Sequence, residues 1–253
     1  MTQLTQTTAV FIKYARGVIR NPYLVAAGVI QPLLYLYLFG PLLTSLSPLN
    51  HGSGMTSYDI FVPALLIQLV LFGAAFVGLS TISEWRSGEL ERILATPASR
   101  YALLGGRVLC DVVVMVVQAI ILIAAALTLG VRQNLGTLAS IIALVAILTV
   151  AVSSMSYLFA LTTKSEQALA GIANGLLLPA VLLAGIMLPM SLAPDWLRVA
   201  SRFNPLTYVV DGARALFVPT QPGWHIWLGF AVATLLAVTL FWLAHRKMSS
   251  DNQ

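Results

Sequence analysis

Few side chains in this sequence could do chemistry, because aspartate, glutamate, lysine and arginine make up only 9% of its 253 residues. It contains no His-Glu-x-x-His, no Gly-x-Ser-x-Gly and no Gly-Lys dipeptide from which a phosphate-binding loop could be built. The three histidines, His51, His225 and His245, lie too far apart to show the spacing of metal ligands. We therefore expect no catalytic residue and no metal site, and the chain is predicted not to be an enzyme.

The densest group of charged side chains lies between positions 84 and 107. It consists of Glu84, Arg86, Glu89, Glu91, Arg92, Arg100 and Arg107. The segment 84–100 predicts a short amphipathic helix that starts at Glu84 and ends at Thr96 and Pro97, and a second helix is expected to begin near Ser99. A helix that carries both charge signs is either a solvated face or a docking surface for a cytoplasmic partner, and both interpretations stay open here.

Elsewhere, charged residues are confined to the edges of six long uncharged runs. These runs cover residues 21–58, 60–83, 112–131, 133–163, 167–194 and 215–245. Each reaches the length of about 20 helical residues that crosses a bilayer core of roughly 30 Å. Since a lipid environment requires every backbone group to be paired within a helix or a closed barrel, we predict an all-α integral membrane protein with six transmembrane helices. The expected spans are about Leu24–Ser45, Ile60–Ile82, Val112–Leu129, Leu138–Leu161, Ala168–Met190 and Ile226–Ala244.

Composition excludes several classes of protein. Hydrophobic residues make up 58% of the chain, and six helices leave no stretch long enough for a separate soluble core, so residues 1–253 are predicted to form a single transmembrane domain. The net charge of +5 comes from lysines and arginines that flank apolar spans, so nucleic-acid binding is not expected. Ten of the 14 lie on the side of the termini and of the segment 84–107, which predicts that both termini are cytoplasmic.

Residues 4–20 have the pattern of an amphipathic helix. Apolar side chains recur on one stripe, whereas Lys13, Arg16 and Arg20 lie on another face. We predict a helix in the membrane surface that Asn21 and Pro22 end, and a frayed leader is the alternative.

Residues 192–217 predict two short outer helices between the fifth and sixth spans. The first is expected to begin at Pro194 and Asp195. In the second, Asn204 is the expected N-cap and Pro205 the first helical residue. An apolar stripe on this second helix is expected to enter the outer leaflet or to pack on the spans.

The spans contain neutral polar residues and small residues at helical spacing. The polar residues are Gln68, Gln118, Ser153, Ser154, Ser156, Tyr157 and Asn174. The small pairs are Gly171 with Gly175, and Ala74 with Gly78. Such residues serve either helix packing or an adaptable, mostly apolar cavity for an amphiphilic substrate.

Asp111 is the ionisable residue that comes closest to lying inside a span. It follows Arg107 by four residues, which is the spacing of a structural pair on a helix. A proton relay is the functional alternative, because ionisable residues within membranes often mark ion or proton pathways.

Two motifs resemble those of the permease subunits of type 2 ABC exporters. The first is the Glu-x-x-x-Gly-x-Leu-Glu pattern followed by Thr-Pro, matched here by Glu84, Gly88, Leu90, Glu91, Thr96 and Pro97. The second precedes the last span and consists of Asn204, Pro205, Leu206, Thr207 and Tyr208. The resemblance extends over nearly the whole chain and is closest to drug and antibiotic exporters of the daunorubicin-resistance type.

This resemblance implies an ATP-driven exporter in a bacterial plasma membrane, with its energy supplied by a separate cytoplasmic ATPase that binds ATP and magnesium. The permease itself would hold no cofactor. Two permease copies, surrounded by membrane lipid, would pair with two ATPases. Within the coupling segment 84–100, the stretch from about Glu84 to Ala95 would be the coupling helix. The docking residues of the segment would be Glu84, Arg86, Gly88, Glu89, Leu90, Glu91, Arg92, Thr96, Pro97 and Arg100.

The family further implies a substrate cavity at the dimer interface, formed mainly by spans one, two and five. Aromatic and polar side chains available there are Tyr35, Phe72, Phe76 and Asn174. Such groups suit drugs, antibiotics or lipid-linked molecules with hydrophobic rings or chains. An ion-coupled secondary transporter, and a non-transporting scaffold or intramembrane enzyme, are the alternatives.

Overall fold

The computed structural model describes residues 3–45, 57–89, 92, 99–186, 193–218 and 222–250. Within these ranges the chain forms ten α-helices and no strand, which confirms the all-α prediction. The helices are α1 (Gln3–Arg20), α2 (Pro22–Ser45), α3 (Ser57–Ala74), α4 (Gly78–Arg86), α6 (Arg100–Thr128), α7 (Leu135–Thr163), α8 (Glu166–Leu183), α9 (Asp195–Arg202), α10 (Pro205–Phe217) and α11 (Trp224–Ser250).

Five helical segments of the described chain are long and apolar enough to cross a membrane. They are Tyr58–Arg86, Arg100–Thr128, Leu135–Thr163, Glu166–Leu183 and Trp224–Ser250. A sixth span is obtained when Thr5–Arg20 and Val25–Pro41, which meet at a bend of 66°, are counted as one broken span. The protein is therefore a multi-pass integral membrane protein, and the predicted six spans are the upper count.

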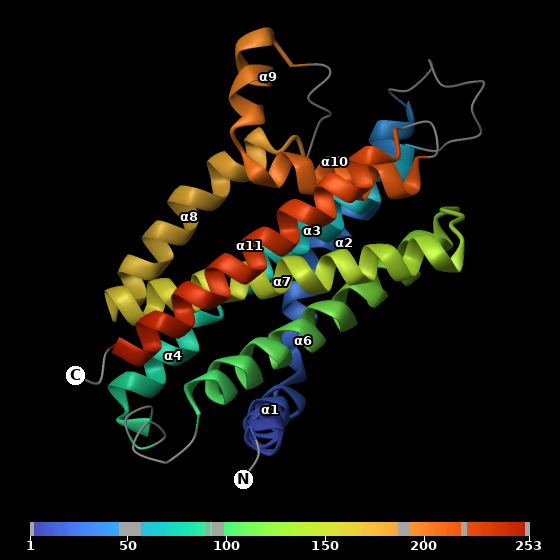
Figure 1. Ribbon diagram of the computed structural model, residues 1–253. Helices are drawn as coiled ribbons and strands as arrows, with labels where there is room; N and C mark the ends of the chain where they lie inside the picture. The colour runs from blue at the N-terminus through green and yellow to red at the C-terminus, as the bar shows by residue number, and fades with distance from the viewer. Residues whose placement is uncertain are drawn as a thin grey trace.

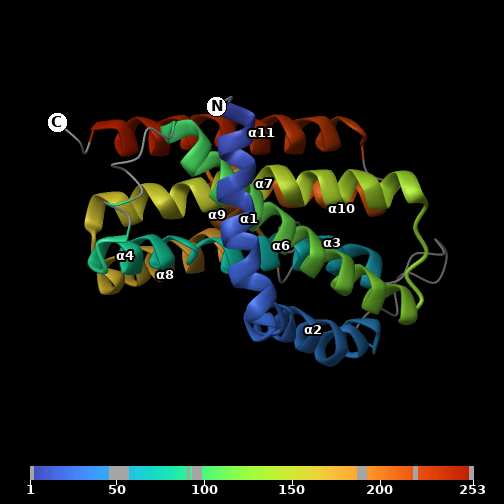
Figure 2. The ribbon, with the colours of Figure 1, turned by 90° about the horizontal axis from the view of Figure 1, so that it is seen from below.

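Helix α7 lies in the middle of the bundle, where it contacts α3, α4, α6, α8, α10 and α11. Figure 2 shows α11 at one edge and α2 at the opposite edge, with α7 and α3 between them. Helix α3 is the most completely buried span, because α2, α6, α7 and α10 pack around it. Helix α8 lies at the periphery (Figure 1), and it leaves Leu176, Leu178 and Leu182 exposed.

The last turn of α4, the start of α6 and the final turns of α11 lie together at one end of the bundle, which we call the α4 end. Here the ring of Tyr101 stacks on His245 with centroids 3.4 Å apart, and Arg100 Nη1 donates to the Met248 carbonyl at 3.1 Å. Helix α1 runs crosswise to the spans (Figure 2) and packs on α6. The opposite end, where α10 packs on the bundle, is called the α10 end.

The predicted amphipathic helix at residues 4–20 is confirmed as α1, and Asn21 separates it from α2. Gly106 allows α1 to approach α6 closely. A Cβ atom added there would lie 2.7 Å from Cβ of Val10 and 2.9 Å from the Thr7 carbonyl oxygen. At the neighbouring Gly105, the nearest atom would be 4.0 Å away, so only Gly106 must be small for this contact.

The second span is broken between α3 and α4, where residues 75–77 form a turn. The hydroxyl of Ser156, on α7, donates to the Ala75 carbonyl at 2.6 Å and accepts from the Gly78 amide at 2.9 Å. Both contacts are buried, so Ser156 pairs backbone groups that lipid could not satisfy. Gly78 lies directly against this serine, which supports helix packing as its role.

Candidate coupling site and membrane cavities

The charged segment after the second span begins differently from the prediction. Glu84 and Arg86 lie in the last turns of α4, so they extend the span rather than open a separate helix. Gly88 has a φ of 71°, a left-handed conformation that favours glycine and ends helices. The Arg92 amide donates to the Gly88 carbonyl at 3.2 Å, and Glu89 and Arg92 are helical. The predicted helix start at Glu84 is therefore wrong.

Glu84 joins three helices through one carboxylate. Its Oε2 accepts a hydrogen bond from the Tyr14 hydroxyl of α1 at 3.0 Å and forms an ion pair with Nη2 of Arg107 on α6. Arg107 Nη1 also donates to the Thr81 hydroxyl at 2.5 Å, and its guanidinium lies 4.9 Å from the Tyr14 ring centroid. We call these four residues the Glu84 cluster.

The ion pair in the Glu84 cluster is largely desolvated. The side chain of Arg107 is 2% exposed and that of Glu84 is 14% exposed. Removing one partner of such a pair leaves the other charge buried, which costs about 3–5 kcal/mol when desolvation is complete. The cluster therefore holds the end of α4, α1 and α6 in one arrangement.

A second, exposed ion pair lies beside the cluster. Lys13 Nζ is 2.6 Å from Glu89 Oε1, and this hydrogen bond lowers the pKa of Glu89 below its ordinary value. Burial raises the pKa of Tyr14 above its ordinary value, so the phenol keeps the proton that it donates to Glu84. About half of each side chain in the Lys13–Glu89 pair is exposed, so this pair contributes little stability.

The same segment also contacts the start of α8. Arg86 Nη1 lies 3.1 Å from Glu166 Oε1, and Lys164 Nζ lies 5.1 Å from the Trp85 ring centroid. Arg100, another predicted docking residue, contacts the end of α11. The remaining predicted docking residues, Leu90, Glu91, Thr96 and Pro97, lie outside the described residues.

The motif at 204–208 ties the outer helices to the end of α8. Asn204 Oδ1 accepts from the Leu206 amide at 3.1 Å, which confirms the predicted N-cap, with Pro205 at the first helical position. Its Nδ2 donates to the Ala180 carbonyl of α8 at 2.7 Å. The Thr207 hydroxyl lies 2.8 Å from the Ser201 carbonyl, and the Tyr208 hydroxyl donates to the Arg202 carbonyl at 2.8 Å. These contacts give the motif a structural role.

Arg214 holds the same end of the bundle together from α10. Its side chain is buried, and Nη2 donates to the carbonyls of Gly185 at 2.7 Å and Ile186 at 3.2 Å. Nε lies 3.4 Å from the carbonyl of Ile60 in α3. The predicted apolar stripe of α10 also packs inward, with Val209 and Ala213 fully buried. This confirms packing on the spans.

The four residues predicted to line a substrate cavity lie in different places within one chain. Phe72 lines a small cavity of about 110 Å³ beside α2, and Phe76 lines a larger one next to it. Tyr35 packs edge-on against Phe39 with centroids 5.6 Å apart. Asn174 is exposed on α8 and donates to its own helix at the Ala170 carbonyl. Their meeting at a dimer interface stays a prediction.

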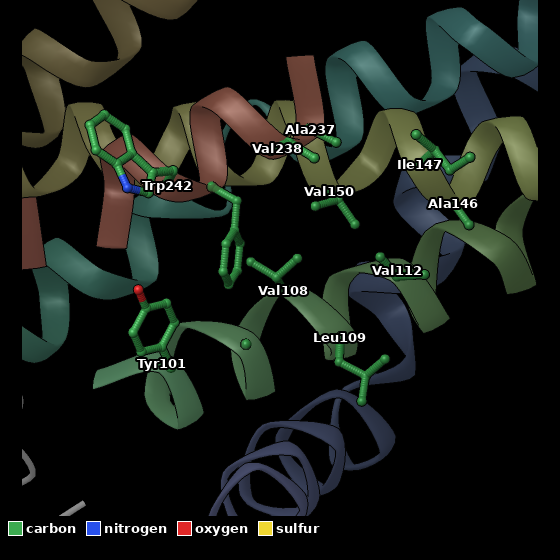
Figure 3. Close-up of a pocket in the computed structure, with 12 residues that line it drawn as sticks. Tyr101, Val108, Leu109, Val112, Ala146, Ile147, Val150, Ala237, Val238 and Trp242 are labelled. Carbon is green, nitrogen blue, oxygen red and sulfur yellow. The ribbon is translucent and has the colours of Figure 1, made fainter. Parts of the chain in front are cut away.

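A separate, apolar groove of about 650 Å³ lies between α6, α7 and α11. Figure 3 shows Val108 and Leu109 of α6 on one side, with Val150 of α7 and Val238 of α11 on the other. Tyr101 and Trp242 lie at the same end of the groove (Figure 3). A wall of aliphatic side chains can hold lipid chains, and it offers almost no group that could orient a polar ligand.

Comparison with known sequences identifies the family. Residues 5–218 match the family described as ABC-2 type transporter, which is most of the chain. The chain belongs to the ABC-2 type transporter family. This confirms the resemblance read from the two motifs, and the protein is called the permease below.

Individual relatives are permeases from different organisms. The permease is 28% identical over 233 residues to a protein of Porphyra purpurea named as the transport permease ycf38, covering 88% of this chain and 79% of that one. It is 24% identical over 228 residues to the daunorubicin resistance ABC transporter permease protein DrrB1 of Streptomyces coeruleorubidus, with the same coverage. It is also 24% identical over 159 residues to a protein of Escherichia coli named as the multidrug ABC transporter permease YbhR, covering 62% and 43%.

Sequence reasoning missed the centre of the Glu84 cluster. It considered an ion pair of Arg107 with Asp111, whereas the structure pairs Arg107 with Glu84 and gives Asp111 a hydrogen bond of 2.7 Å from the Tyr157 hydroxyl. Arg107 reaches Glu84 because the second span continues as α4 to Arg86 and lies beside α6. Tyr14, a polar-tipped aromatic on the apolar stripe of α1, was the available signal for a buried partner.

Proposed function

We propose that the permease is the membrane part of an ATP-driven exporter for an amphiphilic or hydrophobic substrate, such as a drug, an antibiotic or a lipid-linked molecule. Membership in the family supports a partner ATPase subunit. This cytoplasmic ATPase binds ATP and magnesium, and the permease holds no cofactor. The relatives named for daunorubicin resistance and multidrug transport support the substrate class.

The Glu84 cluster is the observation that carries this proposal. Its carboxylate lies at the start of the charged segment 84–100 and contacts both α1 and α6. An ATPase that binds the segment and changes shape on ATP binding would displace the end of α4. Because α1 and α6 are tied to that end, the displacement would reach the spans and convert the cavity between permeases from inward-facing to outward-facing.

The arrangement of the α4 end supports a cytoplasmic location for the ATPase. Helix α1 and the final turns of α11 both lie here, next to the segment 84–100. The excess of lysine and arginine on this side supports a location in the cytoplasm of a bacterial cell. Both termini are then cytoplasmic, and the 204–208 motif lies on the outside.

A second copy of the permease is proposed to pack against α2 and α8. Both helices expose apolar side chains, among them Leu34 and Leu38 on α2 and Leu178 on α8. A Cβ atom at Gly171 or Gly175 would meet no atom of the described residues within 4 Å, so this small-residue face of α8 is not covered by them. Small faces of this kind let membrane helices approach each other closely.

Co-purification tests the proposed role of the segment. Reversing Glu89 and Glu91 to lysine is expected to reduce recovery of the ATPase or to leave ATP hydrolysis without transport, while membrane insertion stays normal. Asp195→Lys reverses an exposed acidic side chain at the opposite end and serves as the control. Normal ATPase recovery and normal export in the double variant would contradict the proposal.

An ion-coupled transporter remains the second candidate because of Asp111. This carboxylate lines a cavity and accepts a hydrogen bond from Tyr157. Such a transporter would stop when the proton gradient is collapsed while ATP persists. An ATP-driven exporter would continue under the same conditions, so measuring substrate efflux with a protonophore in ATP-loaded vesicles separates the two.

A further inference from the structure

A cavity of about 520 Å³ lies within one chain, between α1, α2, α3, α6 and α7 on the side of α6 opposite the apolar groove. Most of its wall is apolar and includes Val25, Phe76, Val114 and Met115. It differs from the apolar groove because Asp111, Gln118 and Arg107 also line it. An apolar wall with a few convergent polar groups is the usual composition of a ligand site.

Two buried polar atoms at this cavity have no hydrogen-bond partner among the residues that the structure describes. Gln118 is 2% exposed, and its Nε2 donates to the Val25 carbonyl at 3.0 Å while its Oε1 is unpaired. Nε of Arg107 is likewise unpaired, although both terminal nitrogens of this arginine are used within the Glu84 cluster. An unpaired buried polar atom costs about 1–3 kcal/mol, which a ligand can recover.

Asp111 adds a carboxylate that forms no ion pair in the described part of the chain, although Arg107 lies one turn away on α6 and lines the same cavity. Arg107 forms its ion pair with Glu84, and among the described residues no lysine, arginine or histidine lies within ion-pair distance of Asp111. The Tyr157 hydroxyl occupies Oδ2 at 2.7 Å. A carboxylate in an apolar wall is stabilised by a cation.

The polar lining continues into the smaller cavity at α2 and α3. The two cavities share Gly28 and Gly73, and the smaller one adds Gln31 and Gln68. Gln68 is 4% exposed, and its Oε1 also has no hydrogen-bond partner within the described part of the chain. Hydrogen-bond acceptors thus follow one another away from Asp111 between otherwise apolar helices.

We propose that this cavity binds an amphiphile whose protonated amine pairs with Asp111 and whose apolar body lies along α2, α3 and α6 beside Gln118. Asp111 and Gln118 are seven residues apart on α6, roughly 10 Å at about 1.5 Å per residue. A ligand with an amine at one end and a hydrogen-bond donor along its length matches this spacing. The site itself is defined by the cavity, and its use in export rests on the proposed function.

Photolabelling of the purified permease in lipid nanodiscs tests the site without the ATPase. The probe is dodecylamine that carries a diazirine on its chain, and the matched probe is the corresponding dodecanol. The amine is expected to label Phe76 or Met115 saturably. Asp111→Asn should weaken amine labelling on the order of 30-fold, as expected for losing one partner of a buried charge pair, and should leave dodecanol labelling unchanged.

Further variants keep the result interpretable if Asp111→Asn does not fold. Asp111→Glu preserves the charge and should retain amine labelling. Val114→Trp fills the cavity and should abolish labelling by both probes, whereas Val112→Trp lies in the apolar groove and should leave labelling at Phe76 and Met115 intact. Equal labelling by amine and alcohol, or amine labelling that is unchanged in Asp111→Asn, would overturn the proposal.

The outcome separates this site from the exporter proposal. If the permease binds the amine but its segment 84–100 does not recruit an ATPase, the proposed site is supported and the proposed exporter function is contradicted. If the ATPase is recruited normally but the amine does not label selectively, the exporter function is supported and the amine site is contradicted.

Discussion

Two buried arginines hold the two ends of the bundle in different ways. At the α4 end, Arg107 pairs with the carboxylate of Glu84, next to the charged segment that is proposed to receive the ATPase. At the α10 end, Arg214 donates to backbone carbonyls of Gly185, Ile186 and Ile60. One arginine therefore depends on a side chain at the end of α4, and the other on the backbone at the ends of spans.

This difference indicates which end can move. A side-chain ion pair lets α4, α6 and α1 shift together, whereas carbonyls at the ends of α3 and α8 move only when those helices move. The Asn204 and Thr207 contacts reinforce the α10 end with further bonds to backbone carbonyls. We infer that the α10 end stays fixed, whereas the α4 end moves when the ATPase acts on it.

The largest loss of stability is expected from removing the Arg214 side chain, which holds the α10 end together. Arg214→Met should lower the free energy of unfolding by about 3 kcal/mol or more, because three carbonyl acceptors lose their donor inside the protein. Thermal unfolding of the purified permease in detergent measures it. Arg202→Met, at an exposed position in the same outer segment, is the control and should change stability by less than about 0.5 kcal/mol. Equal losses of stability in the two variants would contradict the role of Arg214 in holding the α10 end together.

The second largest loss of stability is expected at the break in the second span. Ser156→Ala should cost about 1–3 kcal/mol, since the Ala75 carbonyl and the Gly78 amide both lose their partner. Thr162→Ala removes an exposed hydroxyl that bonds its own helix on α7 and should be nearly neutral. Unfolding in denaturant compares them, and a neutral Ser156→Ala would mean that the break needs no side chain to hold it.

The crossing of α1 over α6 tests the mobile end directly. Gly106→Ala places a methyl group against Val10 and the Thr7 carbonyl, so it should displace α1 and cost about 1–3 kcal/mol. Gly105→Ala meets no atom closer than 4.0 Å and should be tolerated. Cysteine crosslinking between α1 and α6 reports the displacement. If Gly106→Ala crosslinks as well as Gly105→Ala, the close crossing is not required.

The smallest effect is expected at the exposed Lys13–Glu89 pair. Because the pKa of Glu89 is lowered in the folded chain, its contribution is present above the unfolded value of about 4.3 and is lost as pH falls through the folded value. Lys13→Ala should reduce stability by well under 1 kcal/mol at neutral pH and by nothing measurable at acid pH. If the loss of stability in Lys13→Ala grows as the pH falls, the expected pH dependence is wrong.

Sequence patterns predicted the helices well because the physics of lipid leaves few options. Uncharged length predicted the spans, Asn21 marked the break between α1 and α2, and Asn204–Pro205 marked the start of α10, as the structure confirms. The positions of charged residues did not predict where the helices end. Helix α6 begins at Arg100 and α11 continues to Ser250, both beyond the uncharged runs. Charged residues are tolerated in a helix once it leaves the apolar core of the membrane.

Tertiary contacts were the part that sequence could not supply. Asp111 follows Arg107 at helical spacing, yet Arg107 pairs with Glu84 across two helices. Gly88 resembled one position of a helix motif, and only its φ of 71° shows that it lies where α4 has ended. Both outcomes depend on which helices become neighbours, and one sequence carries no direct record of that.

Transport per ATP hydrolysed, measured on the reconstituted permease–ATPase complex, tests the central claim that the Glu84–Arg107 pair transmits motion. Glu84→Gln is expected to keep ATP hydrolysis while transport per ATP falls at least about tenfold, as losing a buried ionic contact predicts. Exchanging the two charges, with Glu84→Arg and Arg107→Glu, should restore part of the coupling. Wild-type transport per ATP in Glu84→Gln would contradict the account.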